Sequence, residues 1–393
     1  MPDSTPKQFL DLENLAFHEG ATVLLRRALA QLRAGEWFEV HGDSPDLAGH
    51  LAAWCRNQGH RLEAKQGVPG LYRIESAGPT PVTETSRSQV SEVAQPGWGL
   101  APRGAHVETG GPKFAFTLRQ KRDVWARELN SIYAQAAANQ WSAARDIPWG
   151  ELPKLPVDVE NAVAQIMTFL TENEFAALYV PARFIPRIHP HYREVVEVLA
   201  MQIVDEARHA DAFTRRADAG GSGLGTTAAS GQLSLKTLLE EPDFTTATFL
   251  LCVMGEGTFL TLLKFLGDHA PDAATAALAR LAHRDEARHV AFGMEHARYI
   301  FDSEPERRFS LAAAVERRSR MLASISGLSP YVHDALVVFA GGGVSVEQVR
   351  TGARHVAGLQ REMNRARSER LQSLGFEPEI ASRMSAYHTK NFM

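Results

Sequence analysis

Asp205-Glu-Ala-Arg-His209 and Asp285-Glu-Ala-Arg-His289 are two identical pentapeptides in a chain of 393 residues. In each copy Glu and His are three positions apart. On an α-helix, with 3.6 residues per turn, both side chains then lie on one face and can reach one metal ion. A single motif of this kind is often a solvated helix face with a stray histidine. Its identical repetition favours two helices that face a shared site.

Two further acids stand at matched distances before the pentapeptides. Glu256 precedes Glu286 by 30 residues and is flanked, one turn away on either side, by apolar residues. In the earlier half both Glu172 and Glu174 are candidates, and Glu174 precedes Glu206 by 32 residues. The helix face of Glu174 is the more apolar of the two, so we choose Glu174. A buried glutamate needs a metal ion or a proton to be tolerated.

These spacings are those of helical hairpins. About 30 residues, less a turn, make two arms of about 20 Å each, which returns the second arm to the level of the first. Four helices that supply two Glu-x-x-His pairs and two single acids form a di-metal carboxylate site. Four carboxylates with two imidazoles suit iron or manganese better than zinc. The predicted cofactor is two iron ions, with a Mn/Fe pair left open. The predicted metal ligands are Glu174, Glu206, His209, Glu256, Glu286 and His289.

The composition excludes several other classes. Hydrophobic residues make up 44% and charged residues 22% of the chain, and the net charge of −4 argues against a nucleic-acid partner. The two cysteines, Cys55 and Cys252, cannot form a disulfide framework, which suits a reducing cytoplasm. The first ten residues lack an apolar signal segment. Glu256 interrupts the most apolar stretch, Phe244–Leu266, so we expect a buried bundle helix and no membrane span.

The stretch Ser76–Pro112 is rich in Pro, Gly, Ser and Thr and reads as a flexible linker. We therefore expect an N-terminal domain over residues 1–77, a linker over 78–112, and a helical domain over 113–393. The fold class is mainly α: a helix bundle with a small α/β two-layer sandwich. The helices predicted in the larger domain are Thr117–Arg145, Val157–Phe184, His191–Asp218, Phe244–Leu266 and Asp272–Phe301.

The N-terminal domain mixes strand and helix patterns in the order β-α-β-α-β-β, which implies a two-layer sandwich. Its second helix begins at Ser44 or Asp46 and ends at Gly59. The other predicted elements are the strands Phe9–Leu12, Glu36–Val40, Arg61–Ala64 and Leu71–Ile74, and the helix Glu19–Arg33.

Three segments of this domain, Leu32–Val40, Asp43–Asp46 and Trp54–His60, resemble the TusA-like sulfur-carrier domains. That family places a Cys-Pro pair after the first strand, and the cysteine carries the sulfur. Here Phe17-His18 stands at that place, and phenylalanine cannot hold a persulfide. The resemblance therefore implies the fold without the chemistry. We expect a buried, unreactive Cys55 and a role for the domain in docking a partner.

Roughly from Ile132 to Phe292 the chain resembles the ribonucleotide reductase small-subunit branch of the ferritin-like superfamily. The segments that carry this resemblance are Tyr133–Trp141, Asp146–Trp149, Phe169–Glu174, Gly255–Phe259 and Arg284–His289. The resemblance implies a ferritin-like bundle and supports Glu174 over Glu172 as the first acid.

The resemblance also implies that Asp205 and Asp285 accept hydrogen bonds from the ligand histidines of the opposite hairpin. The alternative is that each acid pairs with Arg208 or Arg288 at the surface. Phe213 stands where the reductases have their radical tyrosine. A phenylalanine cannot hold a stable phenoxyl radical, so reductase function is not favoured. The expectation is an O2-activating di-iron oxidase or oxygenase that hydroxylates or N-oxygenates an unidentified small organic substrate.

His283, one turn before Glu286, is expected to be a surface histidine rather than a ligand. The enzyme would need O2, its substrate and an electron-donor protein, and a homodimer is compatible with the sequence. The alternatives are a ferroxidase or other metal-handling protein, and a non-catalytic module that recruits a partner. The residues expected to wall the substrate pocket are Phe213, Phe249, Phe259 and Leu260.

Overall fold

The structure is a computed structural model that describes residues 8–78, 82–84, 89–108, 111–322 and 328–389. The chain divides into two compact units. The first comprises Met1–Glu84 and His106–Gly111, and the second comprises Thr85–Ala105 and Pro112–Met393.

The first unit is a four-stranded sheet with two helices. The strand order is β1-β2-β4-β3, with β1 parallel to β2 and the other neighbours antiparallel. The predicted order β-α-β-α-β-β is thereby confirmed. The elements are β1 (Phe9–Asp11), α1 (Ala21–Leu29), β2 (Trp37–His41), α2 (Leu47–Gln58), β3 (Arg61–Ala64) and β4 (Leu71–Glu75). A separate antiparallel pair joins β5 (Val82–Glu84) to β6 (His106–Glu108).

Alternation along β2 gives the small unit its core, because successive side chains of a strand point to opposite faces. Phe38 and Val40 are fully buried and belong to one hydrophobic cluster with helix residues such as Leu51. Cys55 lies in the same cluster, and burial raises the pKa of its thiol to about 11. It is a core side chain with little thiolate character. Phe17 lies in a 3-10 turn between β1 and α1.

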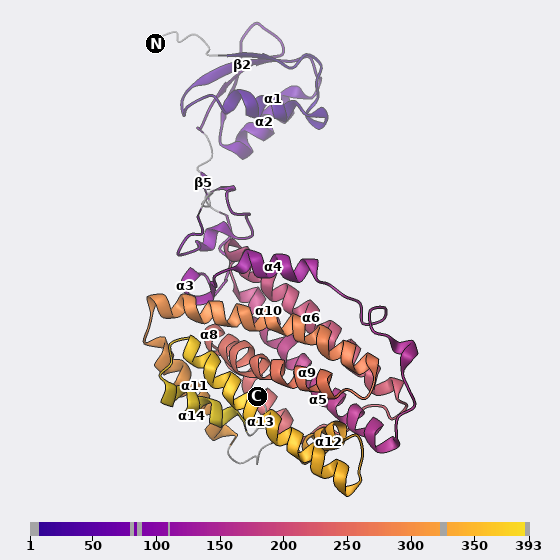
Figure 1. Ribbon diagram of the computed structural model, residues 1–393. Helices are drawn as coiled ribbons and strands as arrows, with labels where there is room; N and C mark the ends of the chain where they lie inside the picture. The colour runs from indigo at the N-terminus through magenta and orange to yellow at the C-terminus, as the bar shows by residue number, and fades with distance from the viewer. Residues whose placement is uncertain (1–7, 79–81, 85–88, 109–110, 323–327, 390–393) are drawn as a thin grey trace. The chain divides into compact units, whose positions relative to one another are not determined.

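The second unit is helical. Figure 1 shows α6 and α10 as long, adjacent helices, with α9 and α5 beneath them in this view. Its helices are α3 (Lys121–Val124), α4 (Leu129–Ala138), α5 (Val157–Phe184), α6 (Arg193–Ala219), α7 (Ala229–Leu239), α8 (Phe244–Thr248), α9 (Gly257–His269), α10 (Ala273–Ser303), α11 (Arg307–Met321), α12 (Pro330–Gly341), α13 (Val346–Ser373) and α14 (Pro378–Thr389). A mainly helical bundle with a small α/β unit is the predicted fold class.

The predicted helix Thr117–Arg145 is wrong. The chain forms α3 and α4 instead, with Trp125 extended between them and Glu128 in the left-handed region at φ 58°. The physical reason is a tertiary contact. The Trp125 carbonyl accepts a hydrogen bond from His296 Nδ1 at 2.8 Å, and an extended Trp125 cannot continue the helix.

α8 and α9 are joined by a π-helical segment, Phe249–Glu256. α10 packs tightly against it. A Cβ atom at Gly293 would lie 2.5 Å from the Cβ of Cys252, so only glycine permits this approach. The stretch Phe244–His269 is long and apolar enough to cross a membrane, yet 78% of its most apolar window is buried inside the unit.

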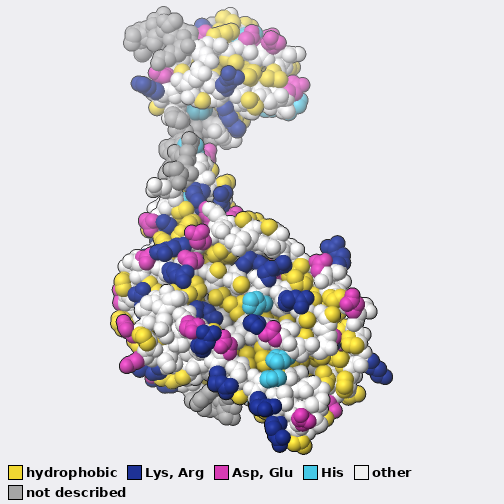
Figure 2. Space-filling view, in the orientation of Figure 1, with side chains coloured by type: hydrophobic (Ala, Val, Ile, Leu, Met, Phe, Trp, Pro, Cys, Tyr) yellow, Lys and Arg dark blue, Asp and Glu magenta, His cyan; other side chains and the backbone are white. Residues whose placement is uncertain are grey.

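Residues 89–105, within the expected linker, contact the start of α6 and the 3-10 turn before it. The Ser91 N–H donates to His191 Nε2 at 2.9 Å, and Arg103 donates to Glu194 at 2.5 Å. The expected boundaries at 77 and 113 stay a prediction. Figure 2 shows basic and acidic side chains interspersed on the visible face of the helical unit.

Candidate metal centre

Four helical segments converge on one buried cluster in the larger unit. α5 supplies one acid, α6 a Glu-x-x-His pair, the end of the π-helical segment another acid, and α10 the second pair. Every one of these side chains is at most 5% exposed. They are the six predicted ligands, Glu174, Glu206, His209, Glu256, Glu286 and His289.

Their ligand atoms form two overlapping groups, in each of which all the atoms lie within 4.8 Å of one another. One group contains Glu174 and His209, and the other contains Glu256 and His289. Both groups contain Glu206 and Glu286. Two ions placed in these groups would therefore share the two glutamates of the repeated pentapeptides, while each kept one acid and one imidazole of its own.

Each histidine points one ring nitrogen at the cluster and the other away from it. His209 Nδ1 lies 3.1 Å from Glu206 Oε2, and His289 Nδ1 lies 3.0 Å from Glu206 Oε1. On the far side, His209 Nε2 lies 3.2 Å from Asp285 Oδ2, and His289 Nε2 lies 3.3 Å from Asp205 Oδ2. With Nε2–H donating to the aspartate, Nδ1 keeps its lone pair for a metal ion.

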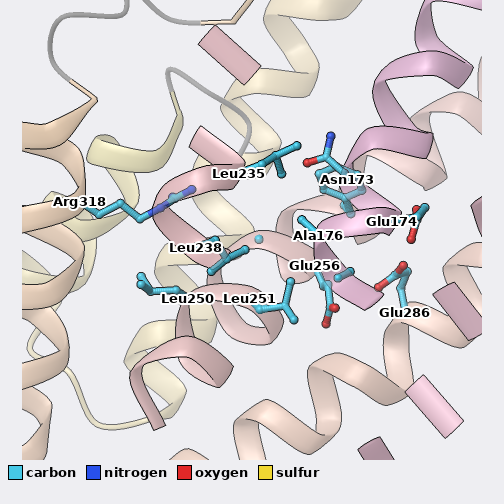
Figure 3. Close-up of a pocket in the computed structure, with 13 residues that line it drawn as sticks. Asn173, Glu174, Ala176, Leu235, Leu238, Leu250, Leu251, Glu256, Glu286 and Arg318 are labelled. Carbon is cyan, nitrogen blue, oxygen red and sulfur yellow. The ribbon is translucent and has the colours of Figure 1, made fainter. Parts of the chain in front are cut away.

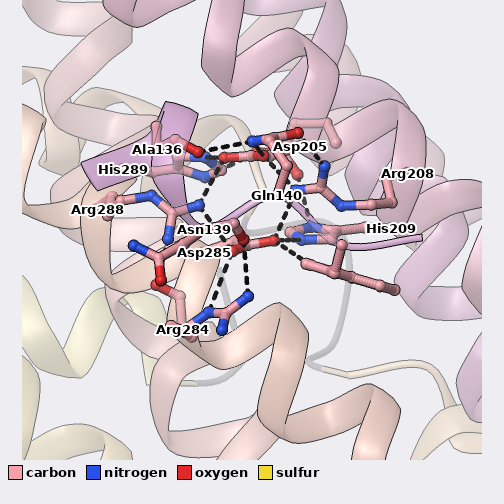
Figure 4. Close-up of polar contacts among 12 residues, drawn as sticks. Ala136, Asn139, Gln140, Asp205, Arg208, His209, Arg284, Asp285, Arg288 and His289 are labelled. Carbon is pink, nitrogen blue, oxygen red and sulfur yellow. Dashed lines mark hydrogen bonds and ion pairs between the residues drawn. The ribbon is translucent and has the colours of Figure 1, made fainter. Parts of the chain in front are cut away.

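The aspartates thus cross between the hairpins as the reductase resemblance implies (Figure 4). They also bind arginines, but inside the protein rather than at its surface. Arg208 donates to Asp285 at 2.8 Å and also contacts Asp205, while Arg288 donates to Asp205 at 3.0 Å and to Asp285 at 2.7 Å. Two buried acids and two arginines form one network behind the histidines. Trp141 Nε1 adds a hydrogen bond to Asp285 at 2.6 Å.

The pKa shifts follow from packing so many charges together. Burial raises the pKa of Glu174, with Glu206 adding to it, and burial raises that of Glu256, with Glu286 adding to it. Burial alone would also raise the pKa of Glu206, but the charge of His289 and the hydrogen bonds from Glu174, His209 and His289 together outweigh burial and lower it. Glu174 and Glu256 therefore favour a proton in the absence of a cation, and a bound cation would take the place of that proton.

Three unpaired oxygens of the cluster show that the residues fit bound cations. Glu174 Oε1, Glu206 Oε1 and Glu256 Oε2 are buried and find no hydrogen-bond partner among the described residues. Buried polar atoms are almost always paired, so each is open to a ligand. Glu174 belongs to one group, Glu256 to the other and Glu206 to both, and all three atoms are carboxylate oxygens, the donors that iron and manganese accept.

The other residues singled out in the sequence lie outside the two ligand groups. Glu172 lies outside both groups and lines another pocket, with Thr226 among its neighbours. His283 belongs to neither group. Phe213, at the position of the reductase tyrosine, is buried with its ring 6.3 Å from that of His209.

The sequence reasoning missed Gln202. Its Nε2 donates to Glu256 Oε1 at 2.8 Å and so fixes one oxygen of that carboxylate while the other stays unpaired. Gln202 stands one helical turn before Glu206, on the ligand face of α6. That position is the signal that could have identified it.

A cavity reaches the cluster (Figure 3). Of the four expected wall residues, Phe259 lines it, whereas the other three are absent from its lining. Phe213 packs against His209, and the ring of Phe249 lies 6.0 Å from that of Phe376. The cavity is lined by Asn173, Glu174, Ala176, Ala177, Leu235, Leu238, Leu250, Leu251, Gly255, Glu256, Phe259, Glu286 and Arg318.

No protein-family model and no curated protein matches the chain. Among solved structures it is similar to an R2-like ligand-binding oxidase from Sulfolobus acidocaldarius, with 17% identity, a TM-score of 0.42, and coverage of 64% of this chain and 92% of that one. A variant R2-like ligand-binding oxidase with a Mn/Fe cofactor has 16% identity, a TM-score of 0.43 and coverage of 66% and 94%. Another, with a Fe/Fe cofactor, has 15% identity, a TM-score of 0.41 and coverage of 67% and 92%.

Proposed function

We propose that this protein is an O2-activating oxidase or oxygenase whose two metal ions, both iron or one manganese and one iron, are held by the six clustered side chains. The observation that carries the proposal is the overlap of two four-residue ligand groups at Glu206 and Glu286. A single mononuclear site would not need six convergent ligands from four helical segments.

The charges support two divalent ions. The four glutamates of the cluster can offset the four positive charges of two such ions. Asp205 and Asp285 do not add to this total, because Arg208 and Arg288 neutralise them. The loaded centre would then be close to neutral, which makes its burial tolerable.

When bound, the two metal ions would supply the redox chemistry with O2. The protein would do the rest. Asp205 and Asp285 orient the two imidazoles, Gln202 orients Glu256, and the apolar cavity holds a substrate beside the centre and excludes water. Phe213 offers no phenol next to His209, so a stored tyrosyl radical is not part of the proposal.

The apolar cavity favours an organic substrate over Fe(II) alone, because a ferroxidase needs a polar path for a hydrated cation rather than leucines. Hydroxylation and N-oxygenation are both compatible with such a cavity. The electron donor, the docking role of the N-terminal domain and a cytoplasmic location stay predictions.

The test is reconstitution of the full-length protein with Fe(II) without oxygen, followed by metal analysis and measurement of O2 uptake with a reductant. We expect about two ions per chain and metal-dependent O2 uptake. Glu174→Gln should lose an ion and most of the uptake, while the matched control Glu172→Gln, two residues away and outside the cluster, should keep both. Failure of the wild-type protein to bind metal, or binding without any O2 uptake, would contradict the proposal.

A further inference from the structure

Arg318 of α11 is a buried cation without an acid beside it. It is 5% exposed and donates to three oxygens, all neutral: the Ser234 carbonyl, the Ser234 hydroxyl and the Thr237 hydroxyl, at 3.0–3.2 Å. Within the described ranges no carboxylate forms an ion pair with it and its Nη1 donates to no protein atom. By contrast, the buried Arg216 pairs with Glu160 and Asp272.

A buried charge is costly unless it is paired. Burial lowers the pKa of Arg318 to about 10, which still leaves it protonated near neutral pH. Three neutral acceptors only partly replace the water that the guanidinium has lost. The side chain therefore lacks a neutralising negative charge, and its Nη1 can still donate to an acceptor.

Arg318 lines the same cavity as the metal-centre acids Glu256 and Glu286. Figure 3 shows Arg318 on one side, the acids on the other, and Leu238 between them. The space is thus polar and positive at one end, apolar along its length, and faced by the metal ligands at the other end.

We propose that the substrate is an elongated organic acid that binds with its carboxylate on Arg318, its apolar body along the leucines and its far end at the metal centre. The planar guanidinium suits a carboxylate, which can accept from Nη1 and relieve the missing charge. This orientation places an unactivated carbon, rather than the acid group, beside the ions. The inference rests on the proposed function for its chemistry, but not for the binding itself.

The structure also indicates where such a molecule enters. Ala176 of α5 and Leu235 of α7 line the inner cavity and also an outer groove beside the exposed Tyr179. The two apolar side chains therefore lie between the cavity and the groove, and we infer that an apolar molecule enters between α5 and α7.

The test measures binding by calorimetry to the full-length protein, both metal-free and loaded with Mn(II) without oxygen. The probes are octanoate and phenylbutanoate, each compared with the alcohol of equal length. We expect the acids to bind at least about tenfold more tightly than the alcohols, as for a hydrogen bond to a charged group. Arg318→Met should abolish that preference and leave alcohol binding intact, and Arg318→Lys should retain part of it.

The matched control is Arg317→Met. It removes the same charge from the same helix, but Arg317 is exposed and lies 3.6 Å from Glu241. It should keep the preference for acids. If Arg318 only clamps α11 to α7, Arg318→Met will lower the melting temperature without changing the ratio of acid to alcohol affinity, and the inference is overturned.

The outcomes separate the two proposals. Acids that bind no better than alcohols to a protein that consumes O2 with Fe(II) would overturn the substrate assignment alone. Acid binding that depends on Arg318 in a protein without metal-dependent O2 uptake would overturn the oxidase alone. The wild-type comparison of acids with alcohols decides the substrate class even if Arg318→Met fails to fold.

Discussion

The two copies of the repeated pentapeptide, on α6 and α10, are identical in sequence and differ in surroundings. Asp285 of the α10 copy accepts hydrogen bonds from Trp141, Arg208 and Arg288 as well as from His209. In the α6 copy, Asp205 has Gln140 in place of the tryptophan, at 3.3 Å. Identical local sequence gives identical ligand positions, while the rest of the chain makes the two halves unequal.

The two acids outside the pentapeptides, Glu174 and Glu256, also differ from each other in their surroundings. Glu174 lies on the regular helix α5, whereas Glu256 ends a π-helical segment and is held by Gln202. Of the two shared glutamates, Glu286 lines the cavity and Glu206 does not. The cluster thus has one side that faces the cavity and one closed side, although its set of side chains is symmetric.

The largest effect, on metal binding, should distinguish the acids that belong to both ligand groups from those that belong to one. Glu206→Gln and Glu286→Gln each remove a ligand from both groups, so we expect the protein to lose both ions, with affinity lowered by at least about 100-fold. Glu174→Gln and Glu256→Gln should each leave about one ion per chain. Metal analysis after dialysis measures this, and equal losses in all four variants would show that no acid is shared.

The next largest effect is on protein stability and concerns two equivalent positions. Arg216 on α6 and His296 on α10 each lie seven residues after the histidine of their pentapeptide. Arg216→Met would leave Glu160 and Asp272 without their buried partner, which should cost about 3–5 kcal/mol of unfolding free energy. Chemical denaturation measures it. The adjacent Arg215→Met is the control, because its exposed pair with Asp211 is worth about 1 kcal/mol or less. A small loss at Arg216 would mean that both acids become solvated.

His296 should make stability depend on pH in a way that Arg216 does not. Burial lowers its pKa to about 4, with Asp243 and Arg307 as the charged groups nearby. The unfolded chain, with a histidine pKa of about 6.5, takes up the proton first, so stability is lost as pH falls from 6.5 toward 4. Between pH 7 and pH 5 the loss should be about 2 kcal/mol.

Denaturation of the wild type and of His296→Gln across this range isolates that contribution, because the other histidines are common to both proteins. The wild type should lose more stability than the variant as the pH falls. Parallel pH profiles would show that His296 is already protonated in the folded protein.

The smallest effect, on metal affinity, should distinguish Asp205 from Asp285. Removing a partner of a ligand histidine lowers metal affinity by about 10–100-fold. We expect Asp285→Asn to lower metal affinity by an amount near the upper end of this range and Asp205→Asn by an amount near the lower end. The reason is that Asp285 also accepts a hydrogen bond from Trp141. Metal titration measures both, with the exposed Asp211→Asn as control. The reverse order would show that the tryptophan does not help to hold the α10 copy.

Much of the site was predictable because it depends on helix periodicity. The three-residue spacing put Glu206 with His209, and the apolar surroundings distinguished Glu174 from Glu172, which the structure separates into different pockets. The helix expected from Thr117 to Arg145 failed because its break depends on His296, which binds the Trp125 carbonyl from 171 positions away in sequence. Local patterns contain no information on such a partner.

By itself the sequence determined which side chains face the interior, since periodicity and apolar neighbours fix the buried face of each helix. Only the tertiary structure decided which acids belong to both candidate ligand groups, which aspartate contacts which histidine, and that Arg318 lines the cavity beside the cluster. These relations join helices that are far apart in the chain, and packing alone sets the distances between them.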